Sequence, residues 1–397
     1  MTRFRPTDTN ELVEIVAAAV AREEPLEITA GGTKRGFGRP LQLPHVVDAS
    51  AFSGVRSYEP EELVITAGAA TPMVEIDRAL ATGNQMLAFE PPDWRPLFGT
   101  TAAEGTLGGL IACNLAGPRR IKQGAARDHF LGFAAVSGRG EAFKAGGKVV
   151  KNVTGYDLCK LVAGSHGTLA VLTEVTMKVL PRPEQARSLA ISGLDGEAAT
   201  RAMTAALNSA HEVSGAAHLP AGESGRDKAL TLLRLEGPGP SVAARATALK
   251  SELASFGRID ERGGEDSARL WRAVRDVAPF APSSDRALWR VSVPPASGAG
   301  VAAAVTRQLD ADHLLDWGGG LVWLAIKGGD DGGAAVIRRA VAACGGHATL
   351  IRAPDAMRAL VPVFEPQAPA LAALSARVKE SFDPRRILNR GRMYSDL

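Results

Sequence analysis

Cysteine is scarce in this sequence, and its scarcity limits the redox chemistry that the chain can carry alone. The three cysteines, Cys113, Cys159 and Cys344, form no C-x-x-C pair. Iron–sulfur clusters are held mostly by four thiolates, so this chain cannot supply such a cluster by itself. Any cluster on an electron path from this protein therefore belongs to a partner. So few cysteines also argue against a disulfide framework.

Two common nucleotide-binding fingerprints are missing as well. No G-x-G-x-x-G run joins a predicted strand to a helix, which removes the usual support for a Rossmann site. The nearest candidate for a Walker A loop, AGGKVV around Lys148, lacks both the upstream glycine and the following Ser or Thr. Nicotinamide and ATP binding are therefore disfavoured.

Long apolar runs and strong charge are also lacking. The N-terminal stretch is interrupted by Asp8, Glu11 and Glu14, which is unlike a signal peptide, and no later run is long enough to span a membrane. The net charge of +3 is too small for a dedicated nucleic-acid binder. These patterns predict a cytoplasmic protein, although a complex with other chains would allow it to lie at the inner membrane.

The N-terminal part alternates short strands and helices. A helix is predicted over 8–22, capped by Thr9 or Asn10, and another over 72–82. Strand patterns occupy 26–29, 45–49 and 63–69, a hairpin is predicted over 131–146, a short helix over 155–163, and a long strand over 168–180. Pro181 and Pro183 place a domain boundary near residue 182.

The C-terminal half repeats a pattern rather than residues. Strands and helices alternate over 187–256 and again over 287–352, and each run resembles a split βαβ, or ferredoxin-like, unit. Two such units side by side would form one broad antiparallel sheet covered by helices. The predicted class is α+β, with domains at 1–182 and 183–397. A last helix at 367–381 is followed by a polar, basic tail, FDPRRILNRGRM (382–393).

A glycine-rich loop, AGGTKRGFG (Ala30–Gly38), directly follows the first long strand. Consecutive glycines let backbone N–H groups point into one concavity, where they can hold a pyrophosphate. Lys34 adds a cation and Thr33 adds a hydroxyl donor. Taken alone, the loop is equally compatible with a surface turn.

More specific stretches are TLGGLIACNLAG (Thr106–Gly117) and KNVTGYDLCKLVAGSHGTLAVLTE (Lys151–Glu174). Together they resemble the flavin-binding domain of the vanillyl-alcohol oxidase/PCMH superfamily, in its 2-hydroxy-acid dehydrogenase branch. Within that branch the chain is most similar to the smaller FAD-binding subunits of bacterial glycolate oxidases. RRIKQGAARDHFLG, DWGGGLVWL and GGHATLIR are similar in style to those subunits.

The resemblance implies a set of FAD contacts. The glycine loop would wrap the pyrophosphate, the second stretch would follow the ribityl chain and isoalloxazine, and the third would close around the adenine. The tail would return to the flavin ring. The residues implied are Gly31, Gly32, Thr33 and Lys34; Thr106, Gly108, Gly109, Asn114 and Gly117; Gly164, Gly167 and Val171; and Asn389.

Three departures from the family pattern affect the site. The family often has Glu where this chain has His166, which we interpret as a surface histidine. The tail has Arg390 where Pro is usual. Some relatives attach FAD through a histidine in the glycine loop, and this loop has none, so the resemblance implies non-covalent FAD.

Oxidation of a 2-hydroxy acid needs a base for the hydroxyl proton and a cation for the carboxylate. The larger catalytic relatives carry a Gly-Asp-Gly-Asn run with two histidines, and this chain lacks that run. His211 and His218 reproduce the spacing, but one ends a helix and the other a strand, so no metal site is predicted. Catalytic residues are left unassigned, with His218, His347 and Arg352 as candidates near strand ends.

A hydrolase interpretation of AGSHG (Ala163–Gly167) fails, because Ala163 replaces the first glycine of G-x-S-x-G and the expected order is helix, turn, strand. Three functions stay open. The chain is an FAD subunit of a glycolate-oxidising complex, beside a larger FAD-binding catalytic subunit and an iron–sulfur subunit. Alternatively, it is a single-chain FAD-dependent 2-hydroxy-acid dehydrogenase, or a structural subunit whose flavin site is occupied but idle.

Overall fold

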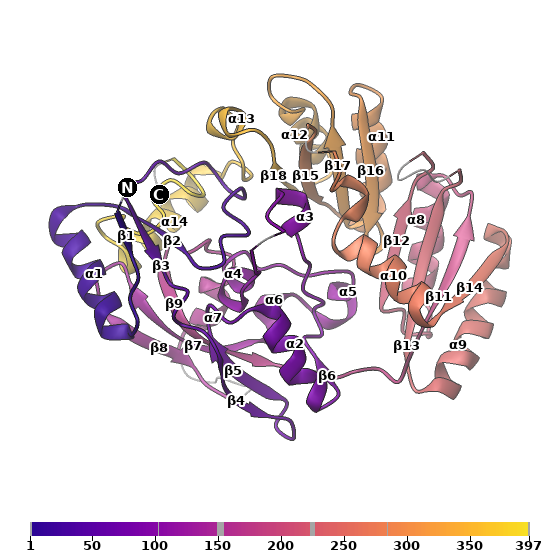
Figure 1. Cartoon of the computed structure of the whole chain (residues 1–397). Helices are drawn as coiled ribbons and strands as arrows, with labels where there is room; N and C mark the ends of the chain where they lie inside the picture. The colour runs from indigo at the N-terminus through magenta and orange to yellow at the C-terminus, as the bar shows by residue number, and fades with distance from the viewer. Residues whose placement is uncertain (1, 102, 149–154, 223–226, 284, 396–397) are drawn as a thin grey trace.

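The computed structural model describes residues 2–101, 103–148, 155–222, 227–283 and 285–395. Lys151–Thr154, which belong to one of the predicted flavin stretches, lie outside the described residues. Two smaller sheets form the N-terminal domain at one end of the molecule, and one broad sheet forms the other end (Figure 1). Among the helices of the described ranges, none has the length and apolar character needed to cross a membrane.

The first subdomain is a small parallel sheet flanked by one helix. The helix buries Leu12, Val16 and Ala19, as its periodicity predicts. Its N-cap is Asp8 rather than the predicted Thr9 or Asn10, because the Asp8 carboxylate accepts from two backbone N–H groups of the first turn. The strand order is β1-β3-β2. The elements are β1 (Thr2–Phe4), α1 (Thr9–Arg22), β2 (Leu26–Thr29) and β3 (His45–Asp48).

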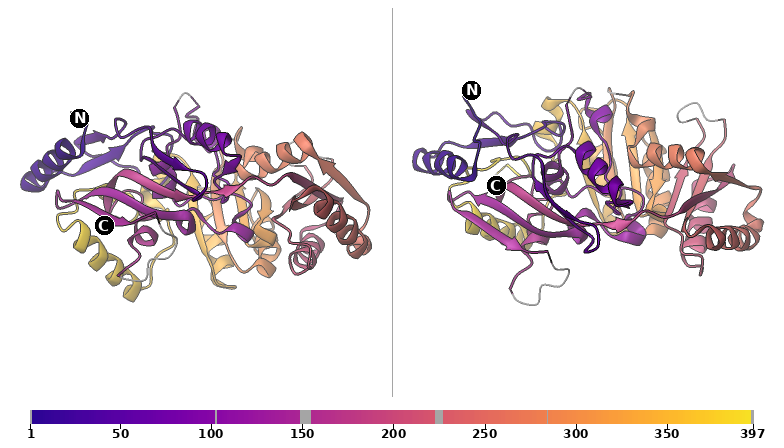
Figure 2. Two further views of the ribbon diagram at one scale, coloured as in Figure 1. Left: turned by 90° about the horizontal axis from the view of Figure 1, so that it is seen from below. Right: turned by 60° about the horizontal axis from the view of Figure 1, so that its bottom comes forward.

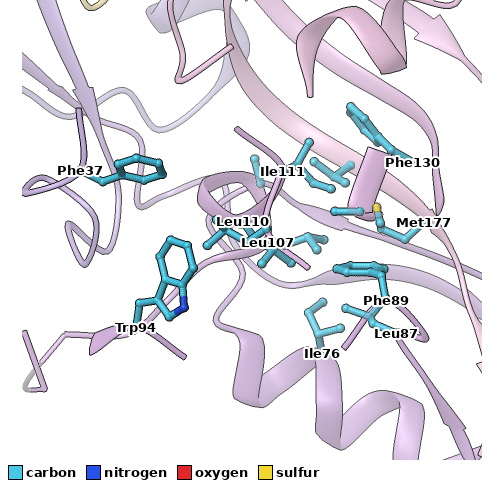
Figure 3. Packing of buried hydrophobic residues seen from close by; sticks show 14 of the residues in the cluster. Phe37, Ile76, Leu87, Phe89, Trp94, Leu107, Leu110, Ile111, Phe130 and Met177 are labelled. Carbon is cyan, nitrogen blue, oxygen red and sulfur yellow. The ribbon is translucent and has the colours of Figure 1, made fainter. Parts of the chain in front are cut away.

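The second subdomain is a five-stranded antiparallel sheet of order β4-β5-β9-β7-β8. Helix α4 packs its apolar side chains into the core of this subdomain (Figure 3). The strands are β4 (Val55–Glu59), β5 (Val64–Gly68), β7 (Phe130–Ser137), β8 (Ala142–Gly146) and β9 (Ala170–Lys178). The helices are α2 (Met73–Thr82), α3 (Arg95–Phe98), α4 (Leu107–Ala112), α5 (Arg120–Gln123), α6 (Ala126–His129) and α7 (Leu158–Val162); a short pair joins β6 (Gln85–Met86) to β10 (Leu180–Pro181).

The C-terminal sheet confirms the predicted duplication. Its order is β14-β11-β13-β12-β16-β17-β15-β18, and each half has the ferredoxin-like βαββαβ succession. The halves meet where His218 of β12 pairs with Leu315 of β16. The first half is β11 (Gln185–Ser192), α8 (Gly196–Leu207), β12 (Gly215–Leu219), β13 (Leu230–Gly237), α9 (Gly239–Glu252) and β14 (Ile259–Gly263). The second is β15 (Ala287–Ser292), α11 (Gly298–Thr306), β16 (Ala311–Asp316), β17 (Leu321–Ile326), α12 (Ala334–Ala342) and β18 (His347–Arg352).

The two faces of this sheet have different neighbours. Alternate residues point to opposite faces, so Trp289 packs among the covering helices while Arg290 points the other way. On that other face, Trp323 belongs to the same buried cluster as Trp94 of the N-terminal domain. Helix α10 (Gly264–Arg275) also covers part of this face, through Trp271. The sheet therefore turns one face toward the N-terminal domain.

Buried ion pairs also join the two domains. Arg234 of β13 donates to both carboxylate oxygens of Glu90, at 2.9 and 3.0 Å. Arg119 donates to Glu236 at 2.6 and 3.0 Å. All four side chains are largely removed from water, and each charge has an opposite partner across the interface.

The last part of the chain returns to the N-terminal domain. Helices α13 (Asp355–Leu360) and α14 (Pro369–Phe382) follow the sheet, and α14 lies beside β8, where Phe382 contacts Phe143 (Figure 2). Beyond α14, Leu388 forms a parallel bridge with Leu26 of β2. The N-terminal domain is thus completed by a segment that comes after the C-terminal sheet.

A buried ion pair fixes this returning segment. Lys379 is 2% exposed, and its ammonium donates to the backbone oxygens of Thr168 and Leu388 at 2.7 and 3.0 Å. It also donates to Asp383, which is fully buried and accepts from the N–H groups of Ile387 and Leu388. One lysine therefore ties α14, the tail and the start of β9 together.

Candidate functional site

A cleft that is partly open to solvent lies in the N-terminal domain. Three walls come from the loop after β2, the segment containing α4, and the turn before β9, and the tail supplies the fourth. Ten of the predicted FAD residues line it: Gly31, Gly32, Thr33, Lys34, Thr106, Gly108, Gly109, Gly167, Val171 and Asn389.

The glycine loop passes close to the segment before α4. A Cβ on Gly31 would lie 1.9 Å from the backbone oxygen of Glu104, so no larger residue fits there. Gly32 has φ +70°, a conformation that L side chains rarely adopt. Lys34 donates to the Thr33 hydroxyl at 3.2 Å, and burial lowers the pKa of its ammonium. The loop thus brings backbone and one cation to the cleft wall.

The second wall begins where α4 begins. The Thr106 hydroxyl caps the helix by accepting from the Gly109 N–H at 3.3 Å. Gly108 donates to the backbone oxygen of Ala69 at 2.6 Å, and a Cβ at this position would overlap that residue. These small residues let the backbone itself form the surface of the cleft.

The third wall corrects the interpretation of His166. This residue is 9% exposed, lines the cleft, and packs its ring edge-on against Phe37 and Phe364. It is therefore not a surface histidine. Burial, with Arg392 nearby, lowers the pKa of His166 to about 3, so its imidazole is neutral at physiological pH. Its Nδ1 lies 3.8 Å from the Cys113 thiol, and burial raises the pKa of that thiol.

Ser165, beside it, has a buried hydroxyl for which the described residues offer no hydrogen-bond partner. An unsatisfied buried hydroxyl is costly, and this one lines the cleft. The turn follows α7 and precedes β9, so the order is helix, turn, strand, opposite to that of a hydrolase nucleophile elbow. The hydroxyl is thus available to a ligand in the cleft rather than arranged as a nucleophile.

The tail closes the fourth side. The Asn389 amide accepts from the Ile28 N–H and donates to the His166 backbone oxygen, both at 2.8 Å. It therefore links the first and third walls. Arg392 also lines the cleft and donates to the backbone oxygen of Arg35 at 3.0 Å. The Arg390 side chain, which replaces the usual Pro, does not line the cleft.

The electrostatics of the cleft suit an anionic ligand. Its described lining contains no Asp or Glu. Lys34, Arg35 and Arg392 all line it, and among the residues that the structure describes only Arg35 of these three forms an ion pair, with Glu27. A glycine cradle, two cations without an ion pair and one unpartnered hydroxyl together fit a dinucleotide pyrophosphate.

Three predicted FAD residues lie away from the cleft lining. Asn114 accepts from the Arg127 N–H, and Gly164 donates to Ile111 close beside it. Gly117 lies at the domain interface, where its oxygen accepts from the indole of Trp317. These residues hold the chain around α4 in place without lining the cleft.

The candidate catalytic residues are not brought together. His218 lies where the two halves of the sheet pair, on the face covered by helices. Its Nδ1 atom lies within hydrogen-bonding distance of the Thr231 hydroxyl, at 2.9 Å. Arg352 donates to the backbone oxygens of Leu97, Phe280 and Ser283. His347 is exposed on β18. None of the three lines the cleft.

Sequence reasoning missed several lining residues, among them Phe37, Cys113, Ser165 and Arg392. Ser165 and Cys113 lie inside the two recognised stretches, so their position was a usable signal. Phe37 and Arg392 lie in the glycine loop and the tail that were also expected at the site, but which of their side chains reach the cleft depends on how the loop and tail fold back. His211 pairs with Glu252 at 2.8 Å, and the described residues contain no group of three or more His, Cys, Asp or Glu arranged for a metal ion.

Comparisons with known proteins agree with this geometry. Residues 3–146 match a family described as FAD binding domain. The chain is 37% identical, over 388 residues, to glycolate oxidase subunit GlcE of Escherichia coli (strain K12), covering 97% of each chain. It is 30% identical to glycolate oxidase subunit GlcD of Bacillus subtilis (strain 168) over 185 residues, 46% of this chain and 38% of that one. Its fold matches 4-ethylphenol oxidase from Gulosibacter chungangensis with TM-score 0.74 at 14% identity, over 99% of this chain and 89% of that one.

Proposed function

Because this chain belongs to the family of glycolate oxidase subunit GlcE and is an FAD-linked oxidoreductase, we propose that it is the smaller flavin subunit of a glycolate-oxidising complex. FAD occupies the cleft described above. The observation that carries this proposal is the cleft itself, with its glycine walls, its cations Lys34 and Arg392 and a described lining free of acidic residues.

The chain's own residues divide the binding work. Gly31, Gly32 and Lys34 hold the pyrophosphate, with backbone N–H groups and one ammonium. Asn389 and Arg392 bring the tail against the opposite side and keep water from it. Bound FAD supplies a hydride acceptor at its N5 atom. The neutral His166 imidazole adds no charge beside the cofactor at physiological pH.

Partners follow from what the chain cannot carry. Its three cysteines are too few for a four-thiolate cluster. The candidate catalytic residues His218 and Arg352 are engaged in structural hydrogen bonds away from the cleft. We therefore assign glycolate oxidation to the assembled complex, in which a larger flavin subunit and an iron–sulfur subunit accompany this chain and carry electrons onward.

The test begins with the purified chain and its absorbance spectrum. We expect stoichiometric FAD and no bleaching by glycolate alone, whereas adding the two partner subunits restores glycolate-dependent reduction. Lys34→Ala should lose FAD, while Lys144→Ala, which changes an exposed lysine of β8, should retain it. Protein that cannot take up FAD would refute the proposed cofactor site. Bleaching by glycolate without partners would instead establish a single-chain dehydrogenase.

If the Lys34→Ala complex loses flavin from this subunit yet turns over unchanged, the flavin has no redox role and the subunit is structural. That outcome would overturn the electron-carrying part of the proposal while leaving the FAD site intact.

A further inference from the structure

A pair of arginines at the domain interface lies outside the flavin cleft. Arg120 belongs to α5, which lies at the junction of the two domains (Figure 1), and Arg290 belongs to β15. Their guanidinium carbons lie 4.3 and 5.1 Å from the centroid of the Trp317 ring. Two cations therefore share one buried aromatic ring.

The pair lacks the partners that the other interface arginines have. Arg119 and Arg234, on the same interface, each bind a buried glutamate. Within the described ranges, no carboxylate lies within ion-pair distance of Arg120 or Arg290, and each makes its observed contact with Trp317. Burial and the neighbouring Arg120 lower the pKa of Arg290 to about 10, and burial also lowers the pKa of Arg120. Because the guanidinium is so strongly basic, both side chains stay charged at physiological pH.

Two acids act on the pair without forming an ion pair with it: Asp128 acts on Arg120, and Asp316 acts on Arg290. Asp316 precedes Trp317 and accepts from its backbone N–H at 2.7 Å. Burial raises the pKa of Asp316 to about 7, so part of this population is neutral near physiological pH. Excess positive charge at a partly exposed position favours an anion from solution.

The strand register adds further groups to the same position. Arg290 pairs with Thr349, and Ser292 pairs with His347, so these side chains share the face that looks toward the N-terminal domain. His347 is exposed, and both arginines contribute to lowering the pKa of its imidazole. The arginine pair is thus bordered by hydroxyl and imidazole groups that can bind a small polar molecule.

The position is connected to the flavin cleft by aromatic side chains. Trp323 is the cross-strand partner of Arg290 on β17. Its ring meets Trp94 at 5.6 Å, and Trp94 meets Phe37 of the cleft wall at 6.0 Å. A chain of aromatic contacts therefore runs from the strand partner of Arg290 to the wall of the cleft.

We propose that Arg120, Arg290 and His347, around Trp317, form a binding site for the carboxylate of a small 2-hydroxy or 2-oxo acid. This inference rests on the proposed function for the class of acid. A guanidinium presents a planar fork that matches a carboxylate, and a hydroxyl or oxo group beside it can bond the imidazole. The chain then holds substrate or product at the face of the C-terminal sheet that looks toward the N-terminal domain. This position is separate from the flavin cleft.

The test uses Trp317 as a reporter on the full-length, FAD-loaded chain. Titration with glycolate should change tryptophan fluorescence saturably, and Trp317→Phe should abolish that change. Arg290→Gln and Arg120→Gln should each weaken binding at least about tenfold, since a hydrogen bond to a charged group contributes roughly 1.5–3 kcal/mol. The control Arg258→Gln changes an arginine whose side chain is 88% exposed and should bind normally.

Several outcomes would overturn the assignment. An equal response to sulfate would mean a general anion site, and unchanged affinity in both arginine variants would remove the site altogether. If Arg290→Gln fails to fold by circular dichroism, Arg290→Lys takes its place and should still weaken binding of a planar carboxylate. If the complex turns over glycolate but the chain shows no saturable fluorescence change with glycolate, this site alone is refuted. If the chain binds glycolate but the complex does not turn it over, the proposed function alone is refuted.

Discussion

Lys379→Met is expected to loosen the tail and weaken FAD binding together. The change removes three hydrogen bonds, to Thr168, Leu388 and Asp383. It also leaves the fully buried Asp383 carboxylate without a cation. Breaking a buried pair in this way costs roughly 3–5 kcal/mol in the free energy of unfolding. Because Asn389 follows closely on this network, the loss should extend to the cleft.

The assay compares urea unfolding of the apo-protein with FAD affinity measured by flavin fluorescence. Lys250→Met, a lysine of α9 with a 45% exposed side chain, is the matched control and should change neither quantity. Lys379→Met/Asp383→Asn should recover about 1–2 kcal/mol, because the amide removes the uncompensated charge. FAD affinity should fall about tenfold in Lys379→Met, which corresponds to about 1.4 kcal/mol.

Two results would refute this reasoning. A loss of unfolding free energy below about 1 kcal/mol would mean that the pair does not hold the tail, since that is the scale of an exposed pair. A full loss of stability with unchanged FAD affinity would mean that the tail does not complete the cleft.

Three other variants or conditions separate the remaining roles. Ser165→Ala should leave the unfolding free energy of the apo-protein equal or slightly higher, because it removes an unsatisfied hydroxyl. The same variant should bind FAD about five- to tenfold more weakly, which calorimetry would measure. Arg234→Met should lower the unfolding free energy by roughly 3 kcal/mol, because Glu90 loses its bidentate partner; a melting temperature like that of the parent would contradict this. Burial raises the pKa of Glu236, but Arg234 and Arg119 outweigh it and lower the pKa to about 2. Ionised Glu236 therefore contributes about 3 kcal/mol to the free energy of unfolding above pH 4.5, and this contribution is lost as the pH falls toward 2. Acid unfolding of the parent and of Glu236→Gln would test this.

Periodicity was enough to predict much of this fold. Helix α1 and the strands of the second ferredoxin-like unit carry regular apolar patterns, and the structure has them within a few residues of the predicted bounds. The duplicated sheet followed from the repeated succession of elements. The resemblance then predicted a flavin domain, because its glycine-rich stretches reflect backbone that must approach a cofactor closely.

What the sequence did not reveal depends on tertiary contacts. Strand β14, IDERG, is a polar edge strand whose pairing with β11 leaves no apolar alternation to detect. The burial of His166 depends on Phe37 and Phe364, which come from distant segments. The sequence predicted that His218 ends a strand. It could not predict which face of the sheet the histidine occupies, because the pairing register sets that face.

The returning tail has a consequence for how the protein is made. Domains fold as they emerge during synthesis, the N-terminal ones first. Here the N-terminal domain lacks α14 and Asn389 until the whole eight-stranded sheet has been synthesised. An early intermediate therefore exposes a three-walled cleft, in which Ile28 and the His166 oxygen still await the Asn389 amide. If FAD binds this cleft as proposed, we expect its tight capture to wait until both domains have been synthesised, so that cofactor loading would report completion of the fold.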